Sequence, residues 1–205
     1  MSTDGLWYFY KVDNAHFKAV KRVFEKASKG MPSLPGIPTL SSYPNTLPVT
    51  QSYVDSWIEN IFTGQDLSSS LYHEPFDILA YQLMEEGYPL SSKDIIEMCA
   101  QSRILPPAVL LVGIGSERFS KLPGHLGNIL LHSTEIDNAR TAVTQVLDID
   151  WESYFERAKK ILDYTGFDSR ASSNLSEILN VIPAALERAT AEDSGLLAIT
   201  SWGCP

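Results

Sequence analysis

The spacing of hydrophobic and polar residues changes several times along the 205-residue chain, and each change marks a predicted element. Residues 6–12 (LWYFYKV) are dense in aromatic side chains, which is typical of a β-strand. Residues 14–29 place apolar side chains three and four positions apart behind a cap at Asp13 or Asn14, which predicts a helix ending at Gly30. Five prolines fall within residues 31–50. Because proline lacks the backbone N–H, this stretch is predicted to be an extended connector.

The middle of the chain is predicted to be mainly helical. Apolar residues at helical spacing cover residues 52–64, 75–87 and 91–99, and Ser91 is the predicted cap of the last of these helices. Two short apolar runs, 108–113 (AVLLVG) and 128–132 (NILLH), are predicted to be strands, with a helical turn at 116–122 between them.

Three more helices and a strand are predicted in the last third. Ser133 begins the first helix, Asp150 caps the second, and Ser173 begins the third, which Pro183 kinks or restarts; residues 196–202 form a final strand. Strands that are few and widely separated by helices favour an α+β fold. We expect a small mixed sheet of few strands covered by several helices, in one domain that spans residues 1–205.

Composition limits the classes of protein that fit. Hydrophobic residues make up 44% of the chain and charged residues 20%, which are ordinary globular values. A net charge of −9 disfavours nucleic acid as a partner. The first residues lack a basic start followed by an apolar stretch, and apolar runs are too short for a membrane span, so we expect a cytoplasmic protein. Cys99 and the four tryptophans are expected in the core, and the remaining cysteine is Cys204.

Charge is distributed unevenly along the chain. Residues 11–29 hold six basic and two acidic residues, a net charge of +4. Residues 55–97 hold nine acidic residues and one basic residue, a net charge of −8. Such segments are either solvated helix faces or a surface for a partner of opposite charge. The second interpretation predicts contacts with a basic protein at Asp55, Glu59, Asp66, Glu85 and Glu86.

A glycine turn within residues 109–119 (VLLVGIGSERF) is the most suggestive local motif. An apolar run leads into Gly113 and Gly115, and Ser116 follows directly. The dinucleotide-binding fingerprint requires a third glycine where Arg118 stands, and no phosphate-loop lysine is present. Two readings remain: a tight turn with Ser116 as helix cap, or a small anion pocket that uses Gly113, Gly115 and Arg118.

Two histidines are further candidates for chemistry. His125 lies in a glycine-rich loop (LPGHLGN) and could act as an acid or base, with His73, Ser116 and Trp57 as other candidates for the same site. His132 and Glu135 have the spacing of a ligand pair on one helical turn, but no third or fourth ligand is identifiable, so no metal is predicted. For each histidine the alternative is a structural or surface role.

Two other chemistries are weaker candidates. Asp148, Asp150 and Glu152 could hold a divalent cation, although Asp150 also fits a helix cap and Glu152 suits the first turn of a helix. The serine-hydrolase motif G-x-S-x-G is absent, because Ser116 follows the second glycine directly. No cofactor is predicted.

Several short segments together resemble a known group of proteins. They are the aromatic strand that leads into a helix, Thr63-Gly64, Pro123-Gly124, the Ser133–Ile136 run (STEI) and the helix that contains residues 184–189 (AALERA). In their order they are similar to the YfbM-like group of uncharacterised bacterial proteins. The resemblance implies a compact α+β fold, and it supplies no catalytic residues because that group has no established activity.

Two functions follow as hypotheses. The first is an interaction protein, of the kind that an immunity protein represents, which binds a basic toxin or effector through the acidic segment. The second is a small enzyme or ligand-binding domain whose site lies near the glycine and histidine loops of residues 113–128. A purely structural subunit is a third alternative.

Overall fold

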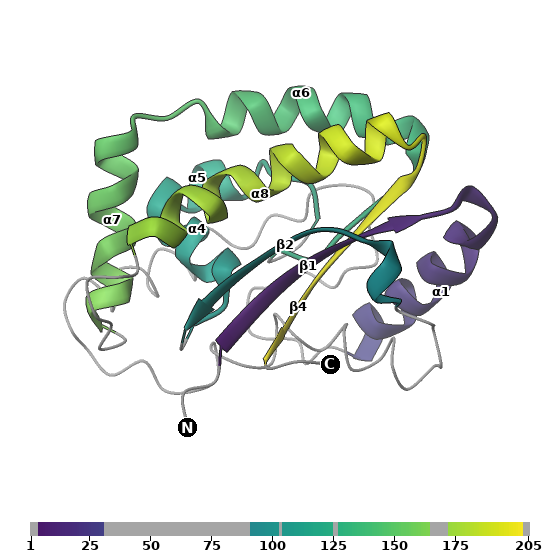
Figure 1. The fold of residues 1–205 in the computed structure, drawn as a ribbon, viewed down its shortest axis with the longest axis horizontal. Coiled ribbons are helices and arrows are strands. Elements are labelled where there is room, and N and C mark those ends of the chain that lie inside the picture. The colour runs from purple at the N-terminus through teal and green to yellow at the C-terminus, as the bar shows by residue number, and fades with distance from the viewer. Residues whose placement is uncertain (1–3, 31–90, 103, 125–126, 165–171, 203–205) are drawn as a thin grey trace.

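The computed structural model describes residues 4–30, 91–102, 104–124, 127–164 and 172–202. Within these residues a four-stranded sheet has the order β2-β1-β4-β3 (Figure 1). The strands are β1 (Asp4–Val12), β2 (Ile95–Ser102), β3 (Ile129–Leu131) and β4 (Gly195–Trp202). The predicted α+β class is confirmed.

All three described strand pairs are antiparallel, so within the described residues the small sheet is antiparallel where a mixture of parallel and antiparallel strands is expected from the sequence. The end of β3 pairs with the beginning of β4, since Leu131 lies opposite Leu196. The helices between these two strands therefore return the chain to the same end of the sheet, which makes the pair antiparallel.

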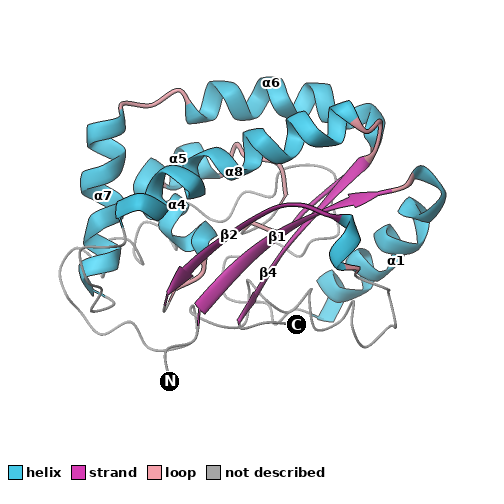
Figure 2. Ribbon diagram, in the orientation of Figure 1, coloured by secondary structure: helices cyan, strands magenta, loops and turns pink. Residues whose placement is uncertain are grey.

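The sheet separates two apolar layers, because successive side chains along a strand point to opposite faces. Trp7 and Phe9 pack into the larger layer with the helices of the second half of the chain. Tyr8 and Tyr10 pack into the smaller layer, to which α1 (Asn14–Gly30) contributes Val20 and other apolar residues. Figure 2 shows the long helices α6 and α8 together on one side of the sheet and α1 away from them.

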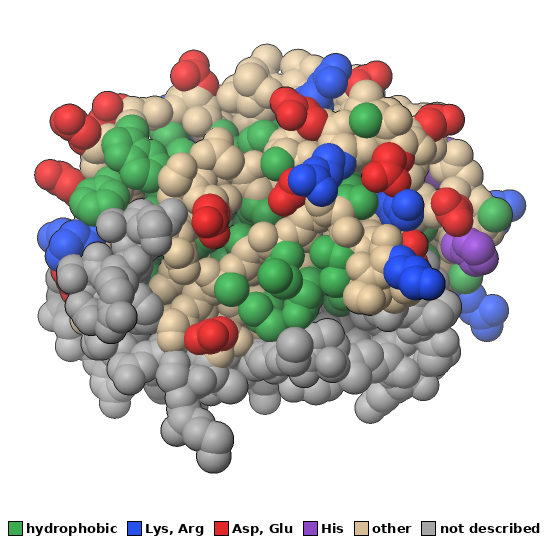
Figure 3. All heavy atoms as spheres, viewed as in Figure 1, with side chains coloured by type: hydrophobic (Ala, Val, Ile, Leu, Met, Phe, Trp, Pro, Cys, Tyr) green, Lys and Arg blue, Asp and Glu red, His purple; other side chains and the backbone are tan. Residues whose placement is uncertain are grey.

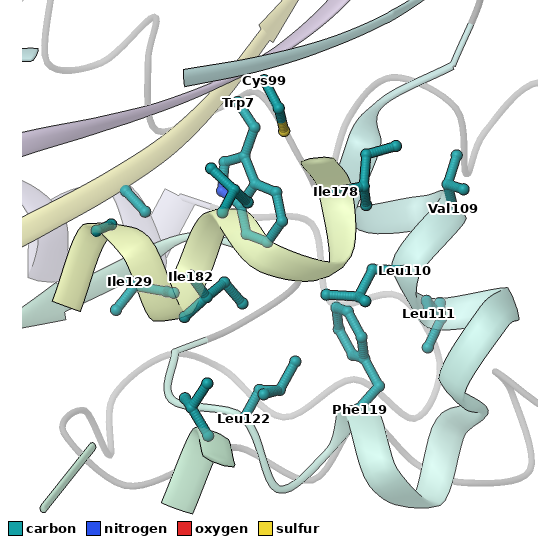
Figure 4. Close-up of a cluster of buried hydrophobic side chains, with 14 of the residues drawn as sticks. Trp7, Cys99, Val109, Leu110, Leu111, Phe119, Leu122, Ile129, Ile178 and Ile182 are labelled. Carbon is teal, nitrogen blue, oxygen red and sulfur yellow. The ribbon is translucent and has the colours of Figure 1, made fainter. Parts of the chain in front are cut away.

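The larger layer is built by five helices, one of which follows a short 3-10 turn. These are α4 (Pro106–Ile114), α5 (Ser116–Phe119), η3 (Ser133–Glu135), α6 (Ile136–Leu147), α7 (Trp151–Tyr164) and α8 (Ser172–Ala191). Every residue of α4 is buried. Figure 4 shows Leu110 of α4 facing Phe119 of α5, with Ile178 of α8 beside them. Pro183 lies inside α8, which continues through it as one helix.

Trp7 connects three segments that are distant in the sequence. Its side chain is fully buried, and its indole N–H donates a hydrogen bond of 2.8 Å to the carbonyl of Gly127. Gly127 has a φ of +86°, and a Cβ there would lie 2.4 Å from Cγ of Pro107. Glycine at 127 therefore allows the loop to approach both the tryptophan and the first turn of α4.

Residues 108–113 form the buried helix α4, and the predicted strand is wrong. Pro106 and Pro107 occupy the first two helical positions, where the missing N–H groups cost no hydrogen bond. An apolar run surrounded by core on all sides lacks the polar face that distinguishes an amphipathic helix, so periodicity alone could not separate the two structures.

Residues 95–102 form strand β2, and the helix predicted from Ser91 is also wrong. Ser91 does cap a turn, but it is the 3-10 turn η2 (Ser92–Asp94), where its side chain accepts from the N–H of Lys93. Phe9 lies opposite Glu97 and Tyr10 lies opposite Ile95, so Ile96 is an extra residue. This β-bulge interrupts the alternation of side chains and produces a spacing that resembles a helix.

The other predicted elements within the described residues are confirmed. They are the strand at 6–12, the helix after Asp13, the turn at 116, the strand at 128–132, the helices that begin near Ser133, Asp150 and Ser173, and the final strand. The connector at 31–50 and the helices at 52–64 and 75–87 lie outside the described residues. Trp151 was expected in the core, but it begins α7 and is 42% exposed. Among the described helices, none combines the length and the apolar character that a membrane crossing needs.

Candidate functional site

Gly113 lies in the last turn of α4, where it makes room for α7. A Cβ at this position would lie 2.3 Å from Cε2 and 2.5 Å from Cδ2 of Tyr154. The tyrosine ring is 1% exposed, and its hydroxyl donates to the carbonyl of Leu175 at 3.2 Å. The glycine is therefore explained by the close packing of two helices.

Gly115 ends α4 and begins α5. Its φ of +83° lies in the left-handed region, which glycine adopts at little cost, and its N–H donates to the carbonyl of Leu111. Ser116 is buried at the start of α5, a helix of only four residues. The predicted tight turn is present here, formed by a helix stop and a new short helix.

Arg118 holds the end of α6. Its Nη1 donates to the carbonyls of Val146 and Asp148, each at 3.0 Å. The last carbonyls of a helix have no partner within the helix and carry partial negative charge, so a guanidinium group stabilises them. The anion pocket inferred from the sequence would have to compete with these two contacts for the same guanidinium group.

Arg157 performs the same function for α4, and the sequence analysis missed it. Its Nε donates to the carbonyl of Val112 at 3.1 Å. An arginine on an exposed helix face gives no sequence signal of this role, because the contact depends on how α7 crosses α4.

His132 and Glu135 form the start of the segment that leads into α6. The carboxylate of Glu135 accepts from the N–H of His132 at 2.7 Å, and Nδ1 of His132 accepts from the N–H of Thr134 at 3.3 Å. The ring of Phe17 meets the imidazole edge-on with the centroids 4.9 Å apart. This reciprocal cap occupies both groups of the candidate ligand pair. Within the residues that the structure describes, no group of three or more His, Cys, Asp or Glu side chains could hold a metal ion.

Asp150 caps α7, as its position in the sequence predicts. Its Oδ2 accepts from the N–H of Ser153 at 2.8 Å, and this hydrogen bond lowers the pKa of the carboxyl group. The nearby Asp148 contributes its backbone carbonyl to Arg118. Asp150 through its carboxylate and Asp148 through its backbone carbonyl thus stabilise the junction between α6 and α7.

Three buried side chains in the core, one cysteine thiol and two tyrosine hydroxyls, have raised pKa values. Burial is the largest cause for Cys99, Tyr154 and Tyr10, and it raises the pKa of Tyr10 to about 12. The Cys99 thiol is 3% exposed and therefore stays protonated at neutral pH. Figure 4 shows its sulfur directed into the core beside Trp7. The expectation that Cys99 belongs to the core is confirmed.

The edge strand β2 carries a second feature that the sequence does not predict. Arg188 of α8 donates from Nη1 to the carbonyl of Ile96 at 2.7 Å and from Nε to the carboxylate of Glu97 at 2.8 Å. Asn174, near the other end of α8, donates to the carbonyl of Ala100 at 3.1 Å. Between these contacts Met98 is 51% exposed. In Figure 3 the corresponding surface shows a hydrophobic patch with acidic and basic side chains around it.

Most of the other candidate residues fall in parts of the chain that the structure does not describe. These are His73, Trp57, His125 and Cys204, and the five acidic residues Asp55, Glu59, Asp66, Glu85 and Glu86. Of the acidic segment 55–97, Asp94 and Glu97 are described; Asp94 is partly exposed in η2, and Glu97 is paired with Arg188.

Comparison with known proteins adds no relative. No protein-family model, no curated protein and no solved structure matches this chain.

Proposed function

We propose that this chain is a cytoplasmic interaction protein that binds a basic partner through the acidic segment 55–97, as an immunity-type inhibitor binds a toxin or effector. The observation that carries the proposal is the concentration of charge, because this segment alone has a net charge of −8 against −9 for the whole chain. A concentrated field of one sign speeds the association of an oppositely charged protein and suppresses the approach of others.

The roles of the described polar residues favour an interaction protein over an enzyme. Arg118 and Arg157 hold helix ends, His132 and Glu135 form a cap, and Gly113 separates two packed helices. Among its described residues, the ligand-binding alternative at residues 113–128 therefore draws on Gly113 and Arg118, which already stabilise the fold. We place it second for that reason. The similarity to the YfbM-like group also remains a proposal, and it adds no catalytic residue.

The test is to isolate the partner and then measure association with purified components. The tagged chain is used to capture proteins from the source cell, and the bound protein is identified by mass spectrometry. The association rate constant of the purified pair is then measured at several salt concentrations. Glu85→Lys/Glu86→Lys should lower this rate constant and flatten its dependence on salt, because the steering field is weakened.

Glu156→Lys/Glu187→Lys is the matched control. It changes the net charge by the same amount at exposed positions on α7 and α8. The proposal is supported if only the first pair affects association. It is wrong if both pairs change the rate constant and its salt dependence equally, since the net charge of the chain would then explain the effect.

A further inference from the structure

Strand β2 forms one edge of the described sheet, and its outer side faces no other described strand. An edge strand offers backbone N–H and C=O groups to any extended chain, including the same strand of a second copy. Three features of the fold oppose such pairing here: the β-bulge at Ile96, the side chain of Arg188 and the side chain of Asn174. The opposite edge is β3, which is only three residues long.

The two carbonyls held by α8 are symmetric about one residue. Arg188 binds the carbonyl of Ile96 and Asn174 binds that of Ala100, and Met98 lies midway between them. In an antiparallel pair with a two-fold axis at Met98, Ile96 of one copy would lie opposite Ala100 of the other. The two hydrogen bonds from α8 thus engage the positions that this pairing would bring together.

The side chains at the centre of this arrangement fit a second copy of the chain. The Met98 side chain is 51% exposed, and the two-fold axis would bring it against Met98 of the other copy, an apolar contact that is complementary to itself. Glu97 opposes the pairing, since two copies would place two carboxylates near one axis. In the structure this carboxylate is 22% exposed and lies 2.8 Å from Arg188, which also holds Ile96.

We propose that β2 is a closed pairing edge: α8 uses Arg188 and Asn174 to prevent two copies of this protein from joining their sheets through β2 about an axis at Met98. Removal of these contacts opens the edge, and the expected product is a dimer with antiparallel β2 strands. The inference concerns self-association and is independent of the proposed basic partner.

The first experiment compares an opened variant with a control on the full-length chain. The opened variant is Glu97→Ala/Asn174→Ala/Arg188→Ala, which removes the ion pair as a unit and leaves the net charge unchanged. The control is Glu187→Ala/Asn180→Ala/Arg22→Ala, which removes the same three residue types from exposed positions on α8 and α1. Size-exclusion chromatography with light scattering should show a dimer for the opened variant alone. A folded opened variant with the mass of a monomer would overturn the proposal.

Cross-linking locates the interface and also covers the case in which the triple variant does not fold. Met98→Cys is introduced with Cys204→Ser, so that the buried Cys99 is the other thiol in the chain. Opposite residues in an antiparallel pair have Cα atoms about 5.5 Å apart, which a disulfide spans. Under mild oxidation, adding Glu97→Ala/Arg188→Ala, which removes the ion pair as a unit, should accelerate the dimeric cross-link about tenfold, as expected for one lost charge-assisted hydrogen bond to the carbonyl of Ile96. Adding Glu187→Ala/Arg22→Ala should leave the rate unchanged.

Equal cross-linking rates in these two backgrounds would also overturn the proposal. A final variant adds Met98→Lys to the opened edge, because a lysine on an edge strand opposes strand addition. We expect it to restore the monomer. A dimer that survives this change would show that another surface joins the copies, and the proposal would be wrong.

Discussion

Gly113→Ala tests whether the glycine motif serves packing or ligand binding. Two effects oppose each other. Alanine is favoured over glycine inside a helix by about 1 kcal/mol, which would stabilise α4. The new methyl group would, however, lie 2.3 Å and 2.5 Å from two ring carbons of Tyr154. Carbon atoms in contact prefer a separation of about 3.5–4.0 Å, so the ring would have to move by more than about 1 Å.

The surroundings of Tyr154 decide which effect is larger. The ring is 1% exposed, and its hydroxyl is held by the carbonyl of Leu175, so both the ring and its polar end resist displacement. Overpacking of a buried site costs about 1–3 kcal/mol, and the short contacts place this case at the upper end. After subtraction of the helix term we expect a net loss of about 2 kcal/mol, which corresponds to a decrease in Tm of about 4–8 °C for a chain of this size.

Urea unfolding and calorimetry measure this loss directly, and a second background tests its cause. In Tyr154→Leu the ring is absent, so Gly113→Ala should there be neutral or stabilising, and the sign of its effect should reverse. Asn138→Ala, at an exposed position of α6, is the control for helix propensity alone and should raise stability slightly. An unchanged or higher Tm for Gly113→Ala in the wild-type background would refute the packing explanation.

Three further predictions concern helix ends and pH. Arg118→Ala should lower the free energy of unfolding by about 1–2 kcal/mol in urea titrations, because the carbonyls of Val146 and Asp148 each lose a hydrogen bond, and Arg118→Lys should recover part of the loss. Burial, with a smaller contribution from Tyr8, raises the pKa of Tyr10 to about 12 from an ordinary value of 10.0, so the unfolded chain loses this proton first and stability falls as pH rises above 10. The free energy of unfolding of Tyr10→Phe, measured by urea titration, should therefore fall less steeply with pH than that of the wild type, by up to about 1.4 kcal/mol per pH unit. An identical slope in the variant and the wild type would contradict the raised pKa of Tyr10. The Ser153 N–H lowers the pKa of Asp150, so the Asp150 carboxylate stabilises the fold at pH values above its unfolded-state pKa, and this stabilisation is lost as the pH falls through the lowered pKa of the folded state. The difference in Tm between the wild type and Asp150→Ala should therefore shrink in acid. Asp150→Asn should retain the cap, because an amide oxygen can also accept the hydrogen bond.

The sequence predicts the described fold well where one physical signal dominates. The aromatic strand β1, the amphipathic stripe of α1 and the cap at Asp150 all depend on interactions within a few residues of the chain. The two wrong elements depend on the tertiary environment. α4 is helical although its apolar run has no polar face, and β2 is a strand although its bulge disturbs the alternation of side chains.

The candidate site was predictable to a smaller extent for a related reason. Gly115 and His132 were recognisable as residues with a special role, because glycine after an apolar run and a histidine before a Ser-Thr-Glu sequence are local patterns. Whether such a residue binds a ligand or a helix end depends on the partner that the fold brings to it. Arg118 reaches carbonyls 28 and 30 residues away, and Arg188 reaches a carbonyl 92 residues away. These contacts have no counterpart in the local sequence pattern.

The order of the strands has a consequence for how the chain folds during synthesis. The central strands β1 and β4 are the first and last described strands of the chain, and Val12 lies opposite Gly195. At ordinary rates of translation, β4 leaves the ribosome roughly 10 to 40 s after β1. For that time the aromatic strand β1 is without one of its two neighbours in the described sheet, and β3 lacks its pairing strand for a shorter time. Two apolar strands of the nascent chain, β1 and β3, therefore lack a pairing partner until β4 is synthesised and completes the described sheet.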